Sequence, residues 1–189
     1  VFLWEGYARL FKGIPGEIVS FDLLNEPPEI GQYGMTRENH ATLIRRTVEA
    51  IWSIDPDRPL MIDGLGGGNI AMPELADLGV VMSTRGYQPM ALTHLFADWC
   101  EETRHINTAS YPGTEWKGRL WNKETLREHY QPWRELESRG VTIFVGEFGC
   151  YNRVDNQQAL AWFKDILSLF AEWRWGYALW EFKGPFGII

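Results

Sequence analysis

Short apolar runs of strand length alternate along the chain with longer amphipathic stretches. The apolar runs cover 17–24, 60–63, 80–83, 141–145 and 177–182. The stretches between them place apolar residues three and four positions apart, as in 43–52, which is the periodicity of a helix with one buried face. This alternation predicts repeated βα units around a parallel sheet, with five strands joined by helices.

The helical stretches carry recognisable start and stop signals. Thr36 is placed to cap the second helix, and the run Asp55-Pro56-Asp57 ends it. Pro132 is a candidate kink in the fourth helix, and Gly140 follows the end of that helix. Five helices are expected. Residues 1–11 form the end of the first, and the second runs from its cap at Thr36 to the stop at 55–57. A short helix lies around 73–78, and the last two cover 122–139 and 157–173.

Two connections between the expected elements differ from ordinary loops. Residues 84–120 form an excursion far longer than the usual connection, which favours a functional loop over filler. Residues 64–69 are rich in glycine, but they lack the GK[ST] ending of a P-loop and do not match GxGxxG. Phosphate binding by this glycine-rich loop is therefore not expected.

Five strands joined by helices fit either a small doubly wound sheet or part of a barrel. In (β/α)8 barrels the chemistry lies at the carboxyl ends of the strands. A doubly wound dinucleotide fold would instead concentrate its signature at one early turn, which is absent here. We predict an α/β fold that is part of a (β/α)8 TIM barrel, because polar, aromatic and glycine residues gather at every strand end: Asn25-Glu26, Asp63-Gly64, Arg85-Gly86-Tyr87, Glu147 and Trp180-Glu181.

Composition limits the chain to one domain with a sizeable core. Of its 189 residues, 45% are hydrophobic and 14% aromatic. The net charge is −7 and no long run of Lys or Arg is present, so nucleic acid is not an expected partner. No apolar stretch reaches the ~18 residues that would span a membrane. A membrane is therefore not an expected partner either. The ten tryptophans suit a neutral saccharide, since sugar-binding clefts stack their ligands on Trp faces.

Cysteine and histidine indicate neither a disulfide framework nor a metal site. Cys100 and Cys150 can pair or stay free, and two thiols define no framework. No two histidines stand at ligand spacing with a carboxylate, so we expect no metal and no other cofactor. His40, His105 and His129 are expected at the surface.

Two strand-end glutamates suggest a specific chemistry. Hydrolysis of a glycoside with retention needs two carboxyl groups about 5 to 5.5 Å apart, one to protonate the leaving oxygen and one to attack the anomeric carbon. Glu26 and Glu147 can meet in this way across the mouth of a barrel. Asn25 offers an amide to the sugar 2-hydroxyl, and Pro27 stiffens the backbone beside the acid. Around Glu147, the small residues Gly146 and Gly149 are expected to leave room for a sugar ring.

The sequences around these glutamates resemble glycoside hydrolase family 5, the cellulase family. The resemblance is carried by FDLLNEP at 21–27, VGEFG at 145–149 and ALWEFKGPFG at 178–187. It implies that the chain runs from about strand four to strand eight of the barrel. It also implies Glu26 as acid/base, Glu147 as nucleophile, Asn25 at the 2-hydroxyl and Trp180 beneath the sugar in the −1 subsite.

One segment departs from the family pattern. The family often shows His-x-Tyr at the end of strand six, whereas this chain has Arg85 in the histidine position, followed by Gly86 and Tyr87. Tyr87 is still expected to donate to Glu147, while Arg85 adds positive charge or marks a branch with different substrate geometry. His94 either lines the cleft or satisfies the loop. Outer sugar subsites and a hydrophobic lid are equal alternatives for Trp99, Trp116 and Trp121.

These residues predict a retaining, endo-acting β-glycosidase whose partner is a β-linked oligo- or polysaccharide. A β-1,4-glucan is the expected substrate, with mannan, xyloglucan and aryl glycosides as alternatives. A catalytically silent carbohydrate-binding fragment is a second hypothesis, and an interaction module that reuses half a barrel is a third. Turnover of a cellooligosaccharide separates the first hypothesis from the other two.

The start of the chain affects the domain assignment. Val1 opens in what reads as mid-helix, without an initiating Met or a charged leader. We therefore expect residues 1–189 to be an incomplete catalytic domain, with the N-terminal strands and any export signal upstream and an extracellular location favoured. Five strands without closure leave open edges, so we expect the isolated chain to aggregate, dimerise or require the upstream half.

Overall fold

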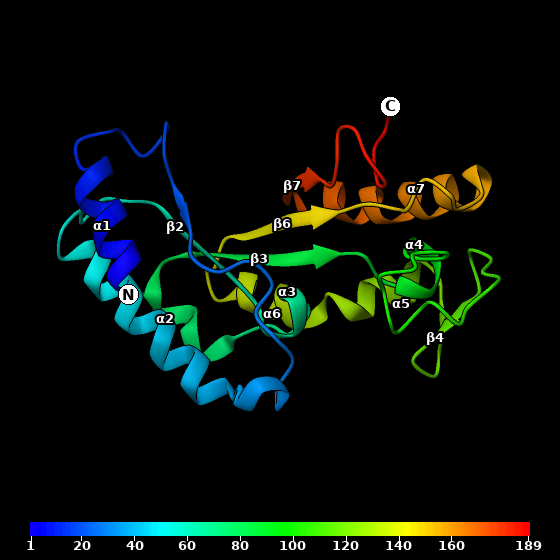
Figure 1. The fold of residues 1–189 in the computed structure, drawn as a ribbon, viewed down its shortest axis with the longest axis horizontal. Helices are drawn as coiled ribbons and strands as arrows, with labels where there is room; N and C mark the ends of the chain where they lie inside the picture. The colour runs from blue at the N-terminus through cyan, green and yellow to red at the C-terminus, as the bar shows by residue number, and fades with distance from the viewer. The chain divides into compact units, whose positions relative to one another are not determined.

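The chain forms two compact units that share one sheet. The computed structural model describes every residue from Val1 to Ile189. The first unit comprises 1–84 and 135–144, and the second comprises 85–134 and 145–189. Strands β3 (Val81–Gly86) and β6 (Ile143–Phe148) run from one unit into the other, as does helix α6 (Gln131–Ser138). The strand order is β1-β2-β3-β6-β7 (Figure 1).

Parallel strands and intervening helices confirm the predicted fold class, part of a (β/α)8 barrel. Phe21 pairs with Leu60, and Met61 pairs with Val81, both in parallel register. The remaining elements in chain order are α1 (Phe2–Phe11), β1 (Phe21–Asp22), η1 (Gln32–Gly34), α2 (Arg37–Trp52), β2 (Leu60–Asp63), α3 (Leu65–Gly68), η2 (Pro73–Leu78), α4 (Met90–Thr93), β4 (Thr114–Trp116), β5 (Arg119–Trp121), α5 (Lys123–His129), α7 (Asn156–Trp173) and β7 (Gly176–Leu179).

In the first unit, helix α2 begins where its cap was predicted. The side chain of Thr36 accepts a hydrogen bond from the Asn39 amide at 3.1 Å, and the Asn39 side chain accepts one from the Thr36 amide at 2.8 Å. This reciprocal pair satisfies two amides that a helix start leaves without partners. The buried face of α2 consists of Ile44, Val48 and Ile51, at the spacing read from the sequence.

A buried arginine joins three segments of the first unit. Arg58 is paired with Asp55 at 2.8 Å and donates to the backbone oxygens of Phe11 and Ile14, each at 2.8 Å. It also donates to the backbone oxygen of Val19. A buried guanidinium requires this full set of acceptors, because an unpaired charge is costly away from water. Arg58 therefore fixes the path from α1 into β1.

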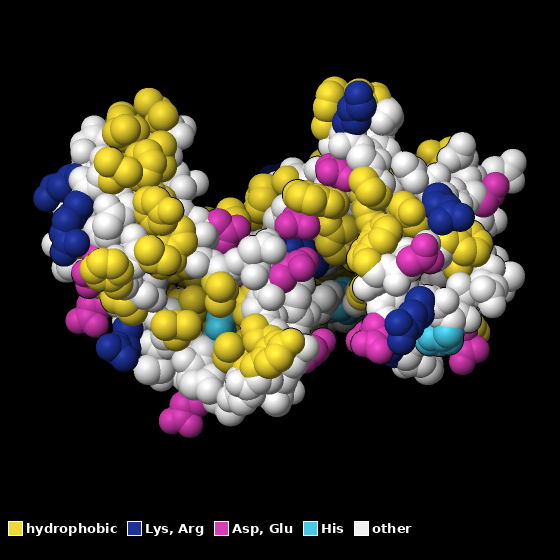
Figure 2. All heavy atoms as spheres, viewed as in Figure 1, with side chains coloured by type: hydrophobic (Ala, Val, Ile, Leu, Met, Phe, Trp, Pro, Cys, Tyr) yellow, Lys and Arg dark blue, Asp and Glu magenta, His cyan; other side chains and the backbone are white.

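The surface of the first unit includes an apolar face on α1. Figure 2 shows hydrophobic side chains gathered over this helix, and Phe2, Leu3 and Leu10 are largely exposed. The opposite face of α1 contributes to the core, since Ala8 is fully buried and Trp4 donates to the Leu23 oxygen at 3.1 Å. None of the helices in either unit combines the length and the hydropathy that a membrane span requires.

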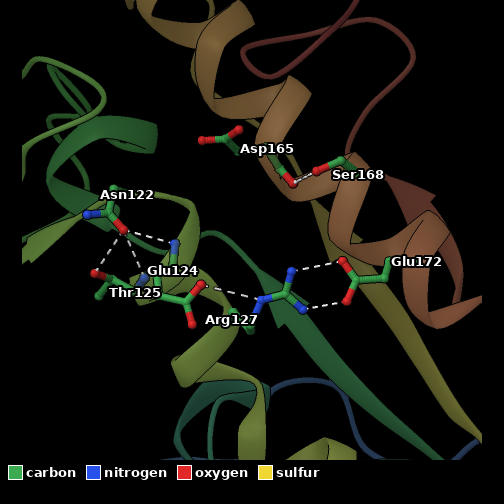
Figure 3. Close-up of polar contacts among 7 residues, drawn as sticks. All are labelled: Asn122, Glu124, Thr125, Arg127, Asp165, Ser168 and Glu172. Carbon is green, nitrogen blue, oxygen red and sulfur yellow. Dashed lines mark hydrogen bonds and ion pairs between the residues drawn. The ribbon is translucent and has the colours of Figure 1, made fainter.

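In the second unit, α5 and α7 lie against each other through a paired arginine. Arg127 on α5 donates two hydrogen bonds to the carboxylate of Glu172 on α7, one of them at 2.8 Å (Figure 3). Asn122 caps α5 by accepting from the amides of Glu124 and Thr125. The two parallel bonds between Arg127 and Glu172 fix the orientation of the two side chains as well as their distance.

Several sequence-based boundaries were wrong for local reasons. The first strand is only Phe21–Asp22 instead of 17–24, because the amides of Ile18 and Val19 donate to the Pro15 oxygen in a turn. The third strand extends beyond Ser83 to Gly86. The predicted helix over 122–139 is two helices, α5 and α6, which Tyr130 separates.

The long excursion has secondary structure of its own, and two histidines differ from expectation. Residues 84–120 contain most of the antiparallel β4–β5 pair, in which Thr114 lies opposite Trp121. His40 is buried on α2, and burial lowers its pKa. His129 is largely buried as well, and burial lowers its pKa to about 4. Both histidines face the core because they stand on the apolar side of amphipathic helices. His105 is exposed, as expected.

Candidate active site

Glu147 lies at the carboxyl end of β6, where both of its carboxylate oxygens have partners. The hydroxyl of Tyr87 donates to Glu147 Oε2 at 2.8 Å. A guanidinium nitrogen of Arg85 lies 3.7 Å from Glu147 Oε1. Tyr87 and Arg85 are two residues apart at the end of β3, so they point to the same face of the sheet. The contact that the sequence predicted for Tyr87 is therefore present.

The glycine between these two residues makes the contact possible. A Cβ atom on Gly86 would lie 2.4 Å from Cβ of Phe148, on the opposite face from Arg85 and Tyr87. No side chain larger than hydrogen fits that gap without moving one of the strands. Gly86 thus lets β3 approach β6 closely enough for Arg85 and Tyr87 to reach Glu147.

The environment of Glu147 is partly dry and carries a fixed positive charge. The Arg85 side chain is 2% exposed and that of Glu147 is 22% exposed. Tyrosine and arginine offer donors to the carboxylate, and an ionised carboxylate accepts from both at once. The backbone oxygen of Arg85 accepts from the hydroxyl of the buried Tyr130 at 3.1 Å, which anchors the strand end. The arrangement holds the Glu147 carboxylate in one orientation while leaving part of it accessible to solvent.

Tyr87 is supported from behind by His94 and Phe186. The rings of His94 and Phe186 lie 5.3 and 5.9 Å from the Tyr87 ring, each edge to face. Thr93 donates to the backbone oxygen of Tyr87, and its hydroxyl lies 3.0 Å from His94 Nδ1. Burial lowers the pKa of His94 to about 4, so the ring is neutral at ordinary pH. His94 therefore satisfies the loop and holds Tyr87, one of the two alternatives read from the sequence.

Trp180 follows β7, and its indole is half exposed at 48%. Its amide donates to the backbone oxygen of Phe148 at 2.8 Å, which fixes it beside the end of β6. A Cβ atom on Gly149 would lie 2.1 Å from the backbone oxygen of Trp180. The expectation that Gly149 leaves room for a sugar ring was therefore wrong, since the space is filled by the backbone of Trp180.

Glu26 lies in the first unit, in the segment that follows β1. Asn25 and Glu26 are both exposed. Glu26 has φ +47°, a left-handed conformation that is unusual for a side chain of this size. Its amide donates to Asp63 Oδ2 at 2.8 Å, and Asp63 is 2% exposed at the end of β2. The sequence marked Asp63 as a strand-end residue but gave no sign of this hydrogen bond.

The glycine-rich loop contacts the same segment. The amide of Gly66 donates to the Pro28 oxygen at 3.1 Å, and the amide of Gly67 donates to the Pro27 oxygen at 2.8 Å. Two of the loop's amides are therefore committed to the chain itself. This finding agrees with the sequence reading that the loop is not a phosphate site.

The tryptophans of the long excursion divide into two kinds. Trp116 and Trp121 are buried, and their indole nitrogens donate to Gln88 Oε1 at 3.0 Å and to the Trp116 oxygen at 3.1 Å. They are packing residues. Trp99 is 60% exposed, and its ring lies 5.0 Å from that of Tyr151, edge to face. An exposed indole held from behind is suited to stack on a sugar.

The chain is similar to known proteins in both sequence and structure. A family model described as Cellulase (glycosyl hydrolase family 5) matches residues 2–184. Endoglucanase C of Acetivibrio thermocellus is 32% identical over 208 residues, covering 96% of this chain and 58% of the relative. The chain thus spans less than two thirds of that curated relative.

Solved structures give the same result. One described as a glycoside hydrolase is 61% identical with a TM-score of 0.97, covering 100% of this chain and 57% of the other. Cel5A of Thermotoga maritima in complex with mannotriose is 27% identical with a TM-score of 0.78, covering 98% and 59%. A mutant form of the same enzyme with cellobiose is 26% identical with a TM-score of 0.81, covering 98% and 58%.

Proposed function

The chain belongs to glycosyl hydrolase family 5, the cellulase family, and we propose that it is part of a catalytic domain that cleaves β-1,4-glucan internally. The proposed reaction is a double displacement that retains the anomeric configuration. It uses two carboxyl groups and no cofactor. We assign residues 1–189 to one catalytic domain, to which both compact units contribute.

One observation supports the proposal most strongly. Tyr87 contacts one carboxylate oxygen of Glu147, and Arg85 contacts the other. A nucleophile must be ionised and aimed before the substrate arrives. The Tyr87 hydrogen bond fixes one oxygen, and the Arg85 charge lies next to the other. Glu147 is accordingly the proposed nucleophile, and Arg85, which stands where the family often has histidine, adds positive charge beside it.

Glu26 is the proposed acid/base. It protonates the leaving oxygen in the first step and removes a proton from water in the second. Asn25 precedes it and is the proposed partner of the sugar 2-hydroxyl, where hydrogen bonds strengthen in the transition state. Trp180 is the proposed platform beneath the sugar, since its indole is half exposed beside the end of β6.

The substrate assignment rests on what the relatives are called. Endoglucanase C supports an internal cut in a β-glucan. The Thermotoga maritima enzyme is described with both cellobiose and mannotriose as substrates. A β-mannan is therefore the second candidate substrate for this chain.

The proposal is tested by assaying the protein at its natural full length on soluble β-glucan, β-mannan and xyloglucan. We expect the viscosity of the β-glucan solution to fall steeply while few reducing ends are released, because each internal cut shortens the polymer strongly. Glu147→Gln is the matched control, because it removes the charge and keeps the shape. Saccharide binding without turnover in the wild type would favour the silent carbohydrate-binding alternative.

A further inference from the structure

Glu26 is held by the neighbouring strand rather than by its own. Strand β1 is only Phe21–Asp22, and the last hydrogen bond that continues its ladder runs from the Leu23 amide to the Met61 oxygen. Beyond Leu23 the chain curls back, and Glu26 takes its left-handed φ of +47°. Such a conformation persists only where the surroundings determine it. The observed determinants come from the end of β2.

The first determinant is the carboxylate of Asp63, which accepts the Glu26 amide at 2.8 Å. Asp63 is 2% exposed, so its position is fixed by the core of the first unit. A hydrogen bond in a dry site is stronger than the same bond in water. The amide of Glu26 is consequently tied to a rigid point of the sheet.

The second determinant is the glycine turn, defined here as Gly64–Gly68. Its Gly66 and Gly67 amides donate to the Pro28 and Pro27 oxygens, directly after Glu26. Gly66 has φ +62°, and an added Cβ would lie 2.9 Å from Glu29 Oε2 and 3.0 Å from Cδ1 of Ile70. The turn therefore needs glycine at this position, both for its conformation and for its space.

We propose that Asp63 and the glycine turn are positioning elements that hold the Glu26 carboxyl for proton transfer. This inference rests on the proposed function, in which Glu26 is the acid/base. A general acid must lie within hydrogen-bond reach of the leaving oxygen, and a shift on the order of 1 Å is costly to the rate. Three hydrogen bonds join the end of β2 and the glycine turn to the backbone of Glu26, Pro27 and Pro28. They restrict the backbone on both sides of the Glu26 Cα.

The test compares two substrates that differ in their need for a proton. Asp63→Ala removes the acceptor, Asp63→Asn keeps an acceptor oxygen of the same shape, and Gly66→Ala disturbs the turn without touching Asp63. Asp57→Ala is the matched control, since Asp57 is exposed beyond the other end of β2. Each variant is assayed at natural full length on a cellooligosaccharide and on a dinitrophenyl β-cellobioside, whose leaving group needs no protonation.

We expect Asp63→Ala to lower kcat/KM, which reports the step that needs the acid, by about 10- to 100-fold on the cellooligosaccharide and by less than about 3-fold on the activated substrate. Gly66→Ala should show the same selectivity with a smaller loss. Asp57→Ala should stay close to wild type on both substrates, and Asp63→Asn should lose less than Asp63→Ala. Thermal melts identify any variant that fails to fold. If Asp63→Ala fails to fold, the comparison of the two substrates is made with Gly66→Ala instead.

The positioning role would be overturned if the variants lost equal activity on the two substrates. It would also be overturned if a folded Asp63→Ala or Gly66→Ala variant lost no activity on the cellooligosaccharide. Glu26→Gln separates this result from failure of the proposed function. If Glu26→Gln discriminates strongly between the substrates and the Asp63 and Gly66 variants do not, only the positioning role is wrong. If Glu26→Gln itself does not discriminate, the acid/base assignment is wrong.

Discussion

The hydroxyl of Tyr87 lies 2.8 Å from Oε2 of Glu147, and this hydrogen bond joins the ends of two neighbouring strands. It depends on Gly86, which lets the strands approach, and on His94 and Phe186, which support the Tyr87 ring. The proposed nucleophile is thus oriented by Tyr87, whose ring is itself supported by two other rings. A change that removes only this hydrogen bond should affect rate more than stability.

Tyr87→Phe should lower kcat by about 10- to 100-fold, because a hydrogen bond to a charged group contributes about 1.5 to 3 kcal/mol. The phenyl ring keeps its contacts with His94 and Phe186, so the midpoint of thermal unfolding should change little. Steady-state kinetics and a melt on the same preparation check both parts. An unchanged kcat would mean that this hydrogen bond does not matter for the reaction.

Arg85→Met should destabilise the fold by about 2 to 4 kcal/mol, since it leaves the carboxylate of Glu147 without its charged partner in a partly dry site. Combining it with Glu147→Gln removes both charges and should recover part of that loss. Denaturant unfolding of the two single variants and the double variant gives the coupling energy. Strictly additive losses would show that Arg85 and Glu147 are not coupled.

Trp99→Ala should raise KM for long cellooligosaccharides by about 3- to 10-fold and leave short aryl glycosides nearly unaffected, if the exposed indole stacks on a sugar. Trp121→Ala provides the contrast. Its side chain is buried, so that variant should lower stability by about 3 to 5 kcal/mol. A Trp99→Ala variant with the same KM on every chain length would assign Trp99 to packing alone.

Stability should fall as pH drops from about 6.5 to about 4. Burial lowers the pKa of His94 and of His129 to about 4, below the ordinary value of 6.5. In that window the unfolded chain binds more protons than the folded chain, so acid favours unfolding by on the order of 2 to 3 kcal/mol per histidine. Above pH 6.5 both rings are neutral in the folded and the unfolded chain, so they add no pH dependence.

Unfolding free energies measured across this pH range check the sign. His94→Gln and His129→Gln should each flatten the dependence, while the exposed His105→Gln should not. A pH dependence that both substitutions leave intact would place its origin in other groups.

The sequence predicted the fold where local signals agreed with packing. The helix cap at Thr36, the strand at 60–63 and the helix ending at Trp173 follow from residue periodicity and capping chemistry alone. The first strand was overestimated because an apolar run, 17–24, was read as one element. A turn at Pro15 takes up two of its amides, and periodicity does not report that competition.

The site shows the same division. The contact between Tyr87 and Glu147 was readable, since both residues stand at strand ends. The hydrogen bond from Glu26 to Asp63 was not, because it depends on a left-handed backbone at Glu26 that no local residue signals. His40 was misplaced because a polar residue on the buried face of a helix looks like a surface residue in sequence.

The central claim, that Glu147 is the nucleophile of a retaining glycosidase, is tested most directly by chemical rescue. Glu147→Gly at natural full length should lose nearly all activity on an activated aryl β-cellobioside. Added azide should restore part of the rate by attacking the anomeric carbon in place of the carboxylate. NMR of the product should show the α-glycosyl azide, with the configuration inverted. A β-glycosyl azide, or full activity without azide, would contradict the account.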